Sequence, residues 1–342
     1  MNKLRRSGNI RFVAILAAVL AVTFIFAFLG LGWARWPLSA QVVWDVLLGG
    51  GSPVNRTIVL DINLPRVIMA VFVGAGLAIS GAVMQALFRN PMASPYILGV
   101  SSGAALGAAI GMLFTIPFIP YLIATPLLAF VFCFGTMMLV YSLSRVGGST
   151  HVETLLLSGI AVGAFISAIV SFLTFIAGDR MEGIVFWSMG SLSKASFMNL
   201  SIVIPVIVAG LFIILMLSKE LNAMMLGDAH AMDLGVDVKR TRLVLLIATT
   251  AVTSVSVAFV GVIGFVGLVI PHIVRMLVGP DNRSVIPLSI FAGAAYLVIC
   301  DYIAHAFSGS VGVMPIGIIT ALIGGPYFIY LLRRRRHQVG WT

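Results

Sequence analysis

The sequence predicts an all-α polytopic membrane protein with about ten transmembrane helices and with both termini in the cytoplasm. Hydrophobic residues make up 60% of its 342 residues, and only 9% are charged. The mean hydropathy is +1.12, whereas soluble domains contain only about 45–50% apolar residues. Because no stretch is long enough for a second, soluble core, we expect residues 1–342 to form a single transmembrane domain.

Apolar runs separated by polar residues, proline or glycine are the expected helices. The first run follows a basic segment, as in a signal peptide, but it is too long for a signal-peptide core, and we interpret it as a retained helix. The break between the seventh and eighth runs is only a glycine kink at Gly261 to Gly264. The ten runs are 12–31, 65–88, 96–116, 121–143, 152–177, 197–218, 241–260, 262–278, 285–306 and 315–332.

The distribution of positive charge predicts the orientation of these helices. The net charge is +10, and sixteen of the 21 Lys and Arg residues fall in segments that alternate from a cytoplasmic start. Such an excess on one side is the positive-inside pattern, which places both termini in the cytoplasm. The charge therefore indicates contact with the lipid bilayer and no nucleic-acid partner. The outer segments hold only Arg35, Arg56, Arg66, Arg180 and Lys194.

Two outer segments are longer than a connection requires. The segment from Gly32 to Asn63 contains a Gly-Gly-Gly-Ser-Pro run, so we expect part of it to be a turn. The segment from Gly178 to Lys194 is expected to contain a short interfacial helix.

A stripe of glycines in the third run predicts close helix packing. Glycines at every fourth position lie on one helix face and let another backbone approach closely. We expect this contact within one subunit rather than between two copies. The glycines are Gly99, Gly103, Gly107 and Gly111.

The strongest functional candidate is the cytoplasmic loop over residues 219–242. It is a polar island in which a short helical segment is bounded by Gly227 and Gly235, and this composition suits a docked helix better than a free loop. The second run ends at another candidate, the tight turn Arg89-Asn90-Pro91, because Pro91 cannot continue a helix. A simple turn explains the proline but not the Arg-Asn pair, so contact with a partner stays an alternative.

Four segments together resemble the permease family of ABC importers for iron-siderophore, heme and cobalamin (the FecCD type, type II importers). They are Leu64-Pro65-Arg66, the stretch from Gly81 to Pro91, the loop around Gly227 to Gly235, and the run from Ser256 to His272. The resemblance extends from about Leu64 to Arg333.

The resemblance implies a set of partners. A second copy of the chain would complete the pathway, and two ATPase subunits carrying ATP and Mg²⁺ would bind the coupling loop, with no cofactor on this chain. An extracytoplasmic binding protein would deliver the substrate, and the location would be the prokaryotic plasma membrane. The implied coupling residues are Gly227, Asp228, Ala229, Ala231, Leu234 and Gly235.

The outer end departs from the family pattern. Relatives carry arginines at positions that here hold Asn63 and His305, and only Arg66 remains. The resemblance implies that Asn63, Arg66 and His305 dock the binding protein, with Arg56 or Arg180 as alternatives. Asp301 and His305 stand four residues apart on one helix face, which indicates a local pair rather than a proton relay.

Small and soft side chains are the expected lining of a weakly polar pathway. They lie on the second and fifth runs. These residues are Ser80, Met84, Gln85, Ser158, Ser167 and Ser171.

Several other functions are disfavoured by the sequence. It contains no Gly-rich phosphate loop ending in Gly-Lys-Ser/Thr, no His-Glu-x-x-His and no metal-ligand cluster, so the chain is not expected to be an enzyme. His272, next to Pro271, is interpreted as structural. The function predicted is the permease subunit of an ATP-driven importer for an iron chelate, heme or corrinoid. The alternative, an ion-gradient-driven secondary transporter, would require carboxylates near the membrane midplane.

Overall fold

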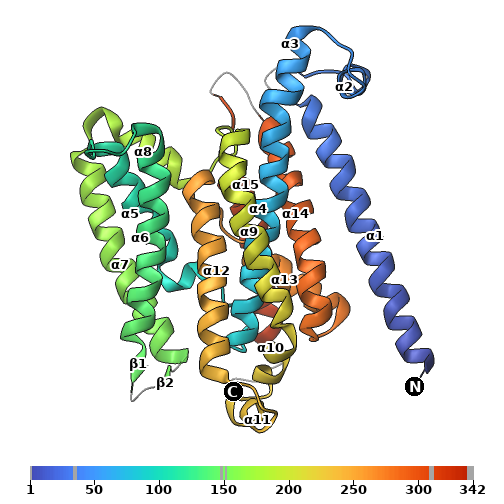
Figure 1. The fold of residues 1–342 in the computed structure, drawn as a ribbon, viewed down its shortest axis with the longest axis vertical. Coiled ribbons are helices and arrows are strands. Elements are labelled where there is room, and N and C mark those ends of the chain that lie inside the picture. The colour runs from blue at the N-terminus through green and yellow to red at the C-terminus, as the bar shows by residue number, and fades with distance from the viewer. Residues whose placement is uncertain (1, 34–36, 147–148, 151, 308–311, 337–342) are drawn as a thin grey trace.

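The computed structural model describes all residues except 1, 34–36, 147–148, 151, 308–311 and 337–342, so Arg35 lies outside the described part. It is a bundle of helices, most of which run along one direction (Figure 1). The all-α membrane fold is therefore confirmed. The long apolar helices are α1 (Asn2–Gly32), α4 (Leu64–Leu87), α6 (Tyr121–Leu143), α7 (Val152–Ile176), α9 (Phe197–Met216), α12 (Val238–Val260) and α14 (Asn282–Ala306).

Three further apolar helices coincide with the remaining predicted runs. They are α5 (Val100–Leu113), α13 (Val266–Val278) and α15 (Ile316–Arg336). Seven helices in the described part are long and apolar enough to cross a membrane, and these three are shorter in their apolar part. The helices thus match the ten predicted runs in position, while helix length alone supports only seven crossings.

Short elements connect these helices. Those on the chain before α7 are α2 (Ala40–Leu47), α3 (Pro53–Arg56), η1 (Thr57–Asn63), η2 (Pro95–Leu98) and the two-residue strands β1 (Arg145–Val146) and β2 (Ser149–Thr150), which pair antiparallel. Those after α7 are η3 (Gly178–Arg180), α8 (Met181–Ser188), α10 (Ser218–Met225) and α11 (Asp228–Asp233).

The second membrane helix begins earlier than the sequence predicted. Residues 53–87 form one continuous helical rod of 35 residues, made of α3, the π-helical turn η1 and α4. Ser52 starts the rod by accepting a hydrogen bond from the backbone N of Asn55 at 3.3 Å, and Pro53 occupies the first turn, where its missing N–H costs nothing. The expected turn is therefore confined to the residues just before Ser52.

Helix α4 lies at the centre of the bundle and packs against α9, α12, α13 and α14. Its glycines allow this. A Cβ built on Gly74 would overlap the backbone of Gly293 on α14, and one built on Gly81 would overlap Gly267 on α13. Small residues let the backbones of two membrane helices come into direct contact. Within a membrane, van der Waals packing and weak polar contacts stabilise such pairs, because the hydrophobic effect does not favour helix association there.

The glycine stripe of α5 packs within the protomer, as predicted. Cβ atoms built on Gly103, Gly107 and Gly111 would meet α6 at Thr136, Leu128 and Thr125 respectively. Gly99, which has a φ of +72°, faces Gly159 and Gly163 of α7 instead.

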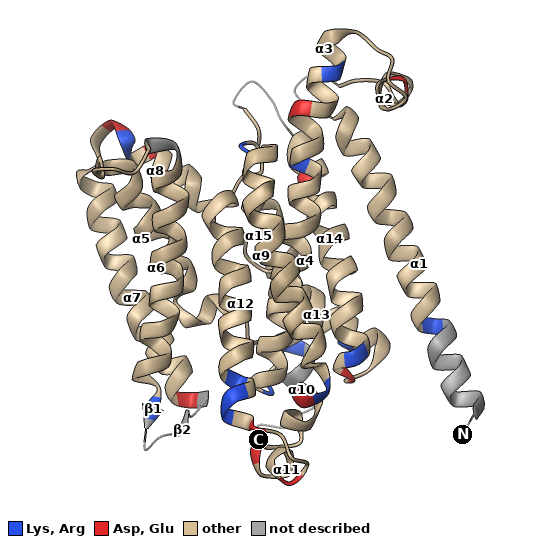
Figure 2. Ribbon diagram, in the orientation of Figure 1, with Lys and Arg blue, Asp and Glu red and all other residues tan. Residues whose placement is uncertain are grey.

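The two ends of the bundle differ in charge. The start of α1 and the end of α15 lie at the same end of the molecule as α11 (Figure 1). Lys and Arg gather at this end around α10 and α12 (Figure 2). Both observations fit the predicted cytoplasmic location of the termini.

Candidate functional site

The cytoplasmic loop folds as a compact unit. The short helix α11 is bounded by Gly227, with a φ of +117°, and Gly235, with a φ of +81°. Backbone hydrogen bonds close its end, from Gly235 N to Met232 O (2.9 Å) and from Val236 N to Ala231 O (3.0 Å). Because glycine adopts positive φ without a steric penalty, these two positions let the chain turn into and out of α11.

An ion pair fixes α11 relative to α12. Nη2 of Arg242 lies 2.9 Å from Oδ1 and 2.7 Å from Oδ2 of Asp228. Asp228 is also the first residue of α11, where a negative charge interacts favourably with the helix dipole. The pair therefore sets both the position and the direction of the short helix.

The loop presents apolar side chains to solvent. Leu226, Met232 and Leu234 are 67%, 59% and 66% exposed, whereas Ala231 is fully buried against the protein. Exposed apolar residues in a polar segment outside the membrane mark a protein interaction surface. Of the predicted coupling residues, Ala231 thus supports the loop from inside and Leu234 faces outward. Leu226 and Met232 were not among the predicted coupling residues, although their apolar character within a polar segment indicates the same exposure as that of Leu234.

The turn at Arg89 adjoins this loop. Arg89 has a φ of +48° and ends α4, where Asn90 N donates to Gln85 O at 3.1 Å. Asn90 Oδ1 accepts from Met92 N at 2.9 Å, so Asn90 shapes the turn itself. Arg89 is exposed, and its Nη1 would lie 3.7 Å from a Cβ built on Gly227. The two elements predicted to meet a partner are therefore neighbours.

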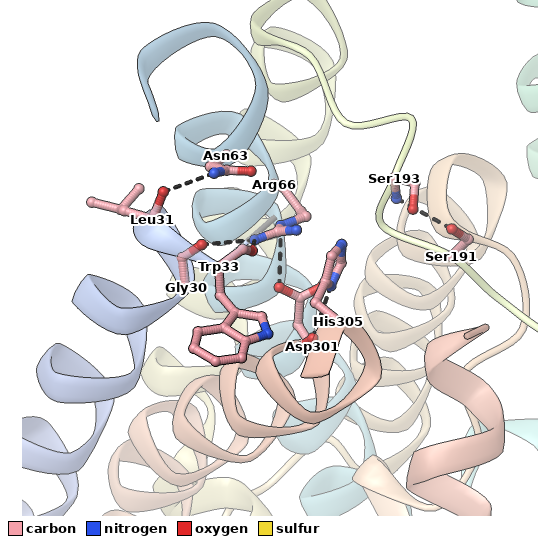
Figure 3. A network of polar contacts seen from close by, with 9 residues as sticks. All are labelled: Gly30, Leu31, Trp33, Asn63, Arg66, Ser191, Ser193, Asp301 and His305. Atoms are coloured by element: carbon pink, nitrogen blue, oxygen red, sulfur yellow. Dashed lines mark hydrogen bonds and ion pairs between the residues drawn. The ribbon is translucent and has the colours of Figure 1, made fainter. Parts of the chain in front are cut away.

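A buried polar network occupies the outer end (Figure 3). Nη2 of Arg66 donates to Gly30 O at 2.7 Å and to Trp33 O at 2.9 Å. Nε of Arg66 lies 3.3 Å from Oδ2 of Asp301, and Nδ1 of His305 lies 3.5 Å from Oδ1 of the same carboxylate. The predicted Asp301–His305 pair is present, and Arg66 joins it to the last carbonyls of α1, which have no partner within their own helix.

The docking residues predicted at this end are buried rather than displayed. Asn63, Arg66 and His305 are only 0%, 4% and 7% exposed. Nδ2 of Asn63 donates a hydrogen bond to Leu31 O at 2.7 Å. The backbone carbonyls of α1 and the carboxylate of Asp301 draw these groups inward. In this conformation they join α1, α4 and α14, and they offer no charge to a docking protein.

The two alternative arginines differ from each other. Nη1 of Arg180 donates to Met112 O and Leu113 O, both at 3.0 Å, and so satisfies the end of α5. Arg56 is exposed in the last turn of α3, and none of the ion pairs among the described residues involves it. Arg56 is therefore the outer arginine of this pair whose charge is available to a partner.

The predicted pathway residues fall into two groups. Ser80, Met84 and Gln85 are buried inside the protomer, where Gln85 Nε2 donates to Leu268 O at 2.9 Å. In this conformation the three side chains pack between α4 and its neighbouring helices, so their predicted role in the pathway stays a prediction. On α7, Ser167 and Ser171 are exposed and Ser158 is half-buried.

These features define a class of protein. A bundle with seven helices long and apolar enough to span a membrane among the described residues, together with a compact polar loop at one end, is the architecture of a polytopic membrane protein. No group of three or more His, Cys, Asp or Glu that could hold a metal occurs among the described residues. The sequence also lacks a nucleotide-binding phosphate loop.

Comparison with known proteins gives the particular family. The model of the FecCD transport family matches residues 20–334, and the chain belongs to this family. The cobalamin import system permease protein BtuC of Halobacterium salinarum is 42% identical over 304 residues, covering 89% of this chain and 81% of the relative. The hemin transport system permease protein HmuU of Yersinia pestis is 37% identical over 308 residues, covering 88% and 90%.

A solved structure agrees with this assignment. An inward-facing conformation of a metal-chelate type ABC transporter superposes with a TM-score of 0.81 at 33% identity, covering 94% of this chain and 99% of the other. The chain is thus a polytopic permease subunit of an ABC importer in the prokaryotic inner membrane, and the ATPase is a separate subunit. The family assignment decides against the ion-gradient-driven secondary transporter.

Proposed function

We propose that this chain, as a homodimer with two ATPase subunits, imports a metal chelate of the siderophore, heme or corrinoid type delivered by an extracytoplasmic binding protein. The observation that carries the proposal is the exposed apolar surface of Leu226, Met232 and Leu234 on a loop fixed by the Asp228–Arg242 pair. Names of the relatives support the substrate class, since they include cobalamin and hemin permeases.

The loop is suited to transmit force. A helix tied by an ion pair to α12 moves α12 when it is moved, and α12 is largely buried and packs against α4, α6 and α9. ATP-driven motion of a subunit that holds Leu226, Met232 and Leu234 would therefore reach the centre of the bundle. Rigid-body motion of helices of this kind is a standard route to alternating access.

Helix α7 is the element best placed to line the pathway. Its exposed residues Leu157, Ile160, Phe165 and Phe172 alternate with Ser167 and Ser171 at helical spacing, so one face of α7 is weakly polar. Such a face can meet a large chelate without holding it. The opposite face packs on α5, where Ser102 and Ser167 share a hydrogen bond of 2.9 Å at its margin.

The test is reconstituted transport with the matched ATPase and binding protein. Leu234→Glu and Met232→Glu place a charge on the apolar surface and should abolish uptake while basal ATP hydrolysis continues. Ser142→Glu introduces the same charge at an exposed position at the end of α6 and should transport normally. Uptake by both loop variants at the parental rate would reject this surface as the coupling contact.

Substrate choice is tested separately. Binding of candidate siderophores, heme and corrinoids to the cognate binding protein, followed by uptake into vesicles, assigns the cargo. Uptake of none of these classes by a system that hydrolyses ATP would reject the substrate proposal and leave the coupling proposal standing.

A further inference from the structure

The short helix α2 at the outer end of the molecule has two apolar faces. On one face, Val43 and Val46 are 1% and 2% exposed and pack against the protein. On another, Trp44 and Leu47, with Leu48 directly after the helix, are 55%, 42% and 73% exposed. These three side chains are three and four residues apart, so they share one side of the helix. The described part of the chain leaves this second face uncovered.

Packing against α1 fixes the depth of α2 in the membrane. The apolar span Arg11–Gly32 has 22 residues, so it is about 33 Å long. The hydrocarbon core of a bilayer is about 30 Å thick. Since α1 starts on the cytoplasmic side, its last turn reaches the outer boundary of that core. Leu31 in this turn packs in one apolar cluster with Val43 and Val46, so α2 lies at the level where the hydrocarbon meets the headgroups.

The exposed face of α2 continues the lipid-facing stripe of α1. Helix α1 lies at the edge of the bundle, and α2 lies beside its outer end (Figure 1). Leu20 and Phe24 on α1 are 44% and 70% exposed, and Phe28 follows one turn later on the same helix face. The ring of Phe28 meets the ring of Trp44 edge to face, with 6.1 Å between the ring centroids. Trp44 therefore extends an apolar surface that already faces lipid.

Other aromatic rings gather at the same level. The ring of Tyr302 on α14 lies 5.4 Å from that of Trp33, just after α1, and 5.5 Å from that of Phe26. Trp and Tyr are enriched where a membrane meets water, because their rings are apolar and their N–H or O–H groups are polar. Trp33, Trp44 and Tyr302 thus mark the outer interface around the end of α1.

The charge of α2 favours lipid over a protein as the occupant of this face. Asp45 is the one charged residue of the helix, and its carboxylate lies against Gly50 in the following turn. The face of Trp44, Leu47 and Leu48 therefore offers a partner no charge. A docking protein steered by complementary charges would find nothing to recognise there.

We propose that α2 is an interfacial anchor, whose Trp44, Leu47 and Leu48 insert into the headgroup region and the upper acyl chains of the outer leaflet. An amphipathic helix in this position buries its apolar face by about 5–10 Å. The anchor holds the last turn of α1 at a fixed depth. In the same turn, Asn63 and Arg66 bind the carbonyls of Leu31 and Gly30, so the anchor also connects the start of α4 to the membrane surface.

The test places a nitroxide label at single cysteines in the permease–ATPase complex, reconstituted in phosphatidylglycerol–phosphatidylethanolamine vesicles without the binding protein. Oxygen concentrates in the hydrocarbon, whereas a neutral nickel chelate stays in water. The label on Leu48→Cys should collide with oxygen several-fold more, and with nickel several-fold less, than the label on Val54→Cys. Val54 is a matched control, since it is 67% exposed and belongs to α3, which projects beyond α2 (Figure 1). The native cysteines are buried and stay unlabelled.

Each other outcome overturns the anchor. Nickel collisions as frequent at position 48 as at position 54 would place the face of α2 in water. Few collisions with either reagent at position 48 would show that a protein surface covers it. A second measurement needs no label: brominated lipid should quench part of the tryptophan fluorescence of the parent, and Trp44→Phe should lose that part. Equal quenching of the parent and of Trp44→Phe would contradict insertion of Trp44.

Discussion

Arg242 holds Asp228 through both carboxylate oxygens, at 2.9 and 2.7 Å, and so connects the first residue of α11 to the first turns of α12. The pair joins the loop that we propose as the ATPase contact to α12, which packs against the central helix α4. The carboxylate side chain is 42% exposed, so its contribution to stability is small, at most about 1 kcal/mol. The pair therefore matters for the connection that it makes between α11 and α12 rather than for the stability of the protein.

Loss of the Asp228–Arg242 pair should uncouple hydrolysis from transport. Asp228→Asn and Arg242→Gln are each expected to reduce the number of substrates moved per ATP several-fold while leaving the melting temperature nearly unchanged. The measurement is uptake and hydrolysis in the same proteoliposomes. The exchange Asp228→Arg with Arg242→Asp restores the pair in the reverse order and should recover part of the ratio. An unchanged ratio in both single variants would show that the pair does not transmit the motion.

Gly235 should tolerate no side chain, although space is available. A Cβ built there meets nothing within 4 Å, but φ is +81°. A left-handed backbone costs a non-glycine residue about 1–2 kcal/mol, so Gly235→Ala should loosen the end of α11 and lower coupled transport. Gly135→Ala also meets nothing within 4 Å, and its φ lies outside the positive range, so it should behave as the parent. Equal transport by the two variants would show that the left-handed backbone of Gly235 is not needed for coupled transport.

The sequence was sufficient to place the helices and the boundaries of the cytoplasmic loop around α11. Apolar periodicity, prolines and glycines act locally, and for this reason α12 and α13 were separated at Gly261 and the loop was bounded at Gly227 and Gly235. Burial within a bundle depends instead on which helices become neighbours. The sequence did not reveal that α4 would be central, and Ser80 was therefore interpreted as pathway lining.

The outer end shows a second limit of the sequence. Arg66 lies in the first turn of α4, near the outer end of the bundle, where a charged residue is ordinarily exposed. It is buried because the carbonyls of Gly30 and Trp33, which precede it by more than thirty positions, accept its hydrogen bonds. Every residue has a backbone carbonyl, so the sequence does not show which carbonyl will accept a hydrogen bond from a distant side chain. The Asp301–His305 pair, in contrast, could be predicted from its spacing of four residues.

The buried Arg66–Asp301 pair should be needed for folding rather than for docking. Removing one partner of a buried ion pair costs about 3–5 kcal/mol, because the other charge is left unpaired. Asp301→Ala and Arg66→Leu should therefore lower the yield in the membrane and the melting temperature in detergent. Asp61→Asn removes a nearby exposed carboxylate and should leave both unchanged. Normal melting together with weak binding-protein affinity in Arg66→Leu would instead favour a docking role.

The exposed face of α7 should lie against a second copy of the chain or along the pathway between two copies. It carries Leu157, Phe165 and Phe172 at 68%, 68% and 61% exposure, and α1 lies at the opposite edge of the bundle (Figure 1). Single cysteines at Phe172 should cross-link two protomers in membranes, and the yield should change when ATP binds. The native cysteines are buried, so they do not compete with the introduced thiol.

Phe24→Cys on α1 is similarly exposed, at 70%, and should react with a soluble or lipid-phase reagent without forming dimers. Cross-linking through position 24 with none through position 172 would place the dimer contact on the other side of the molecule and remove α7 from the pathway.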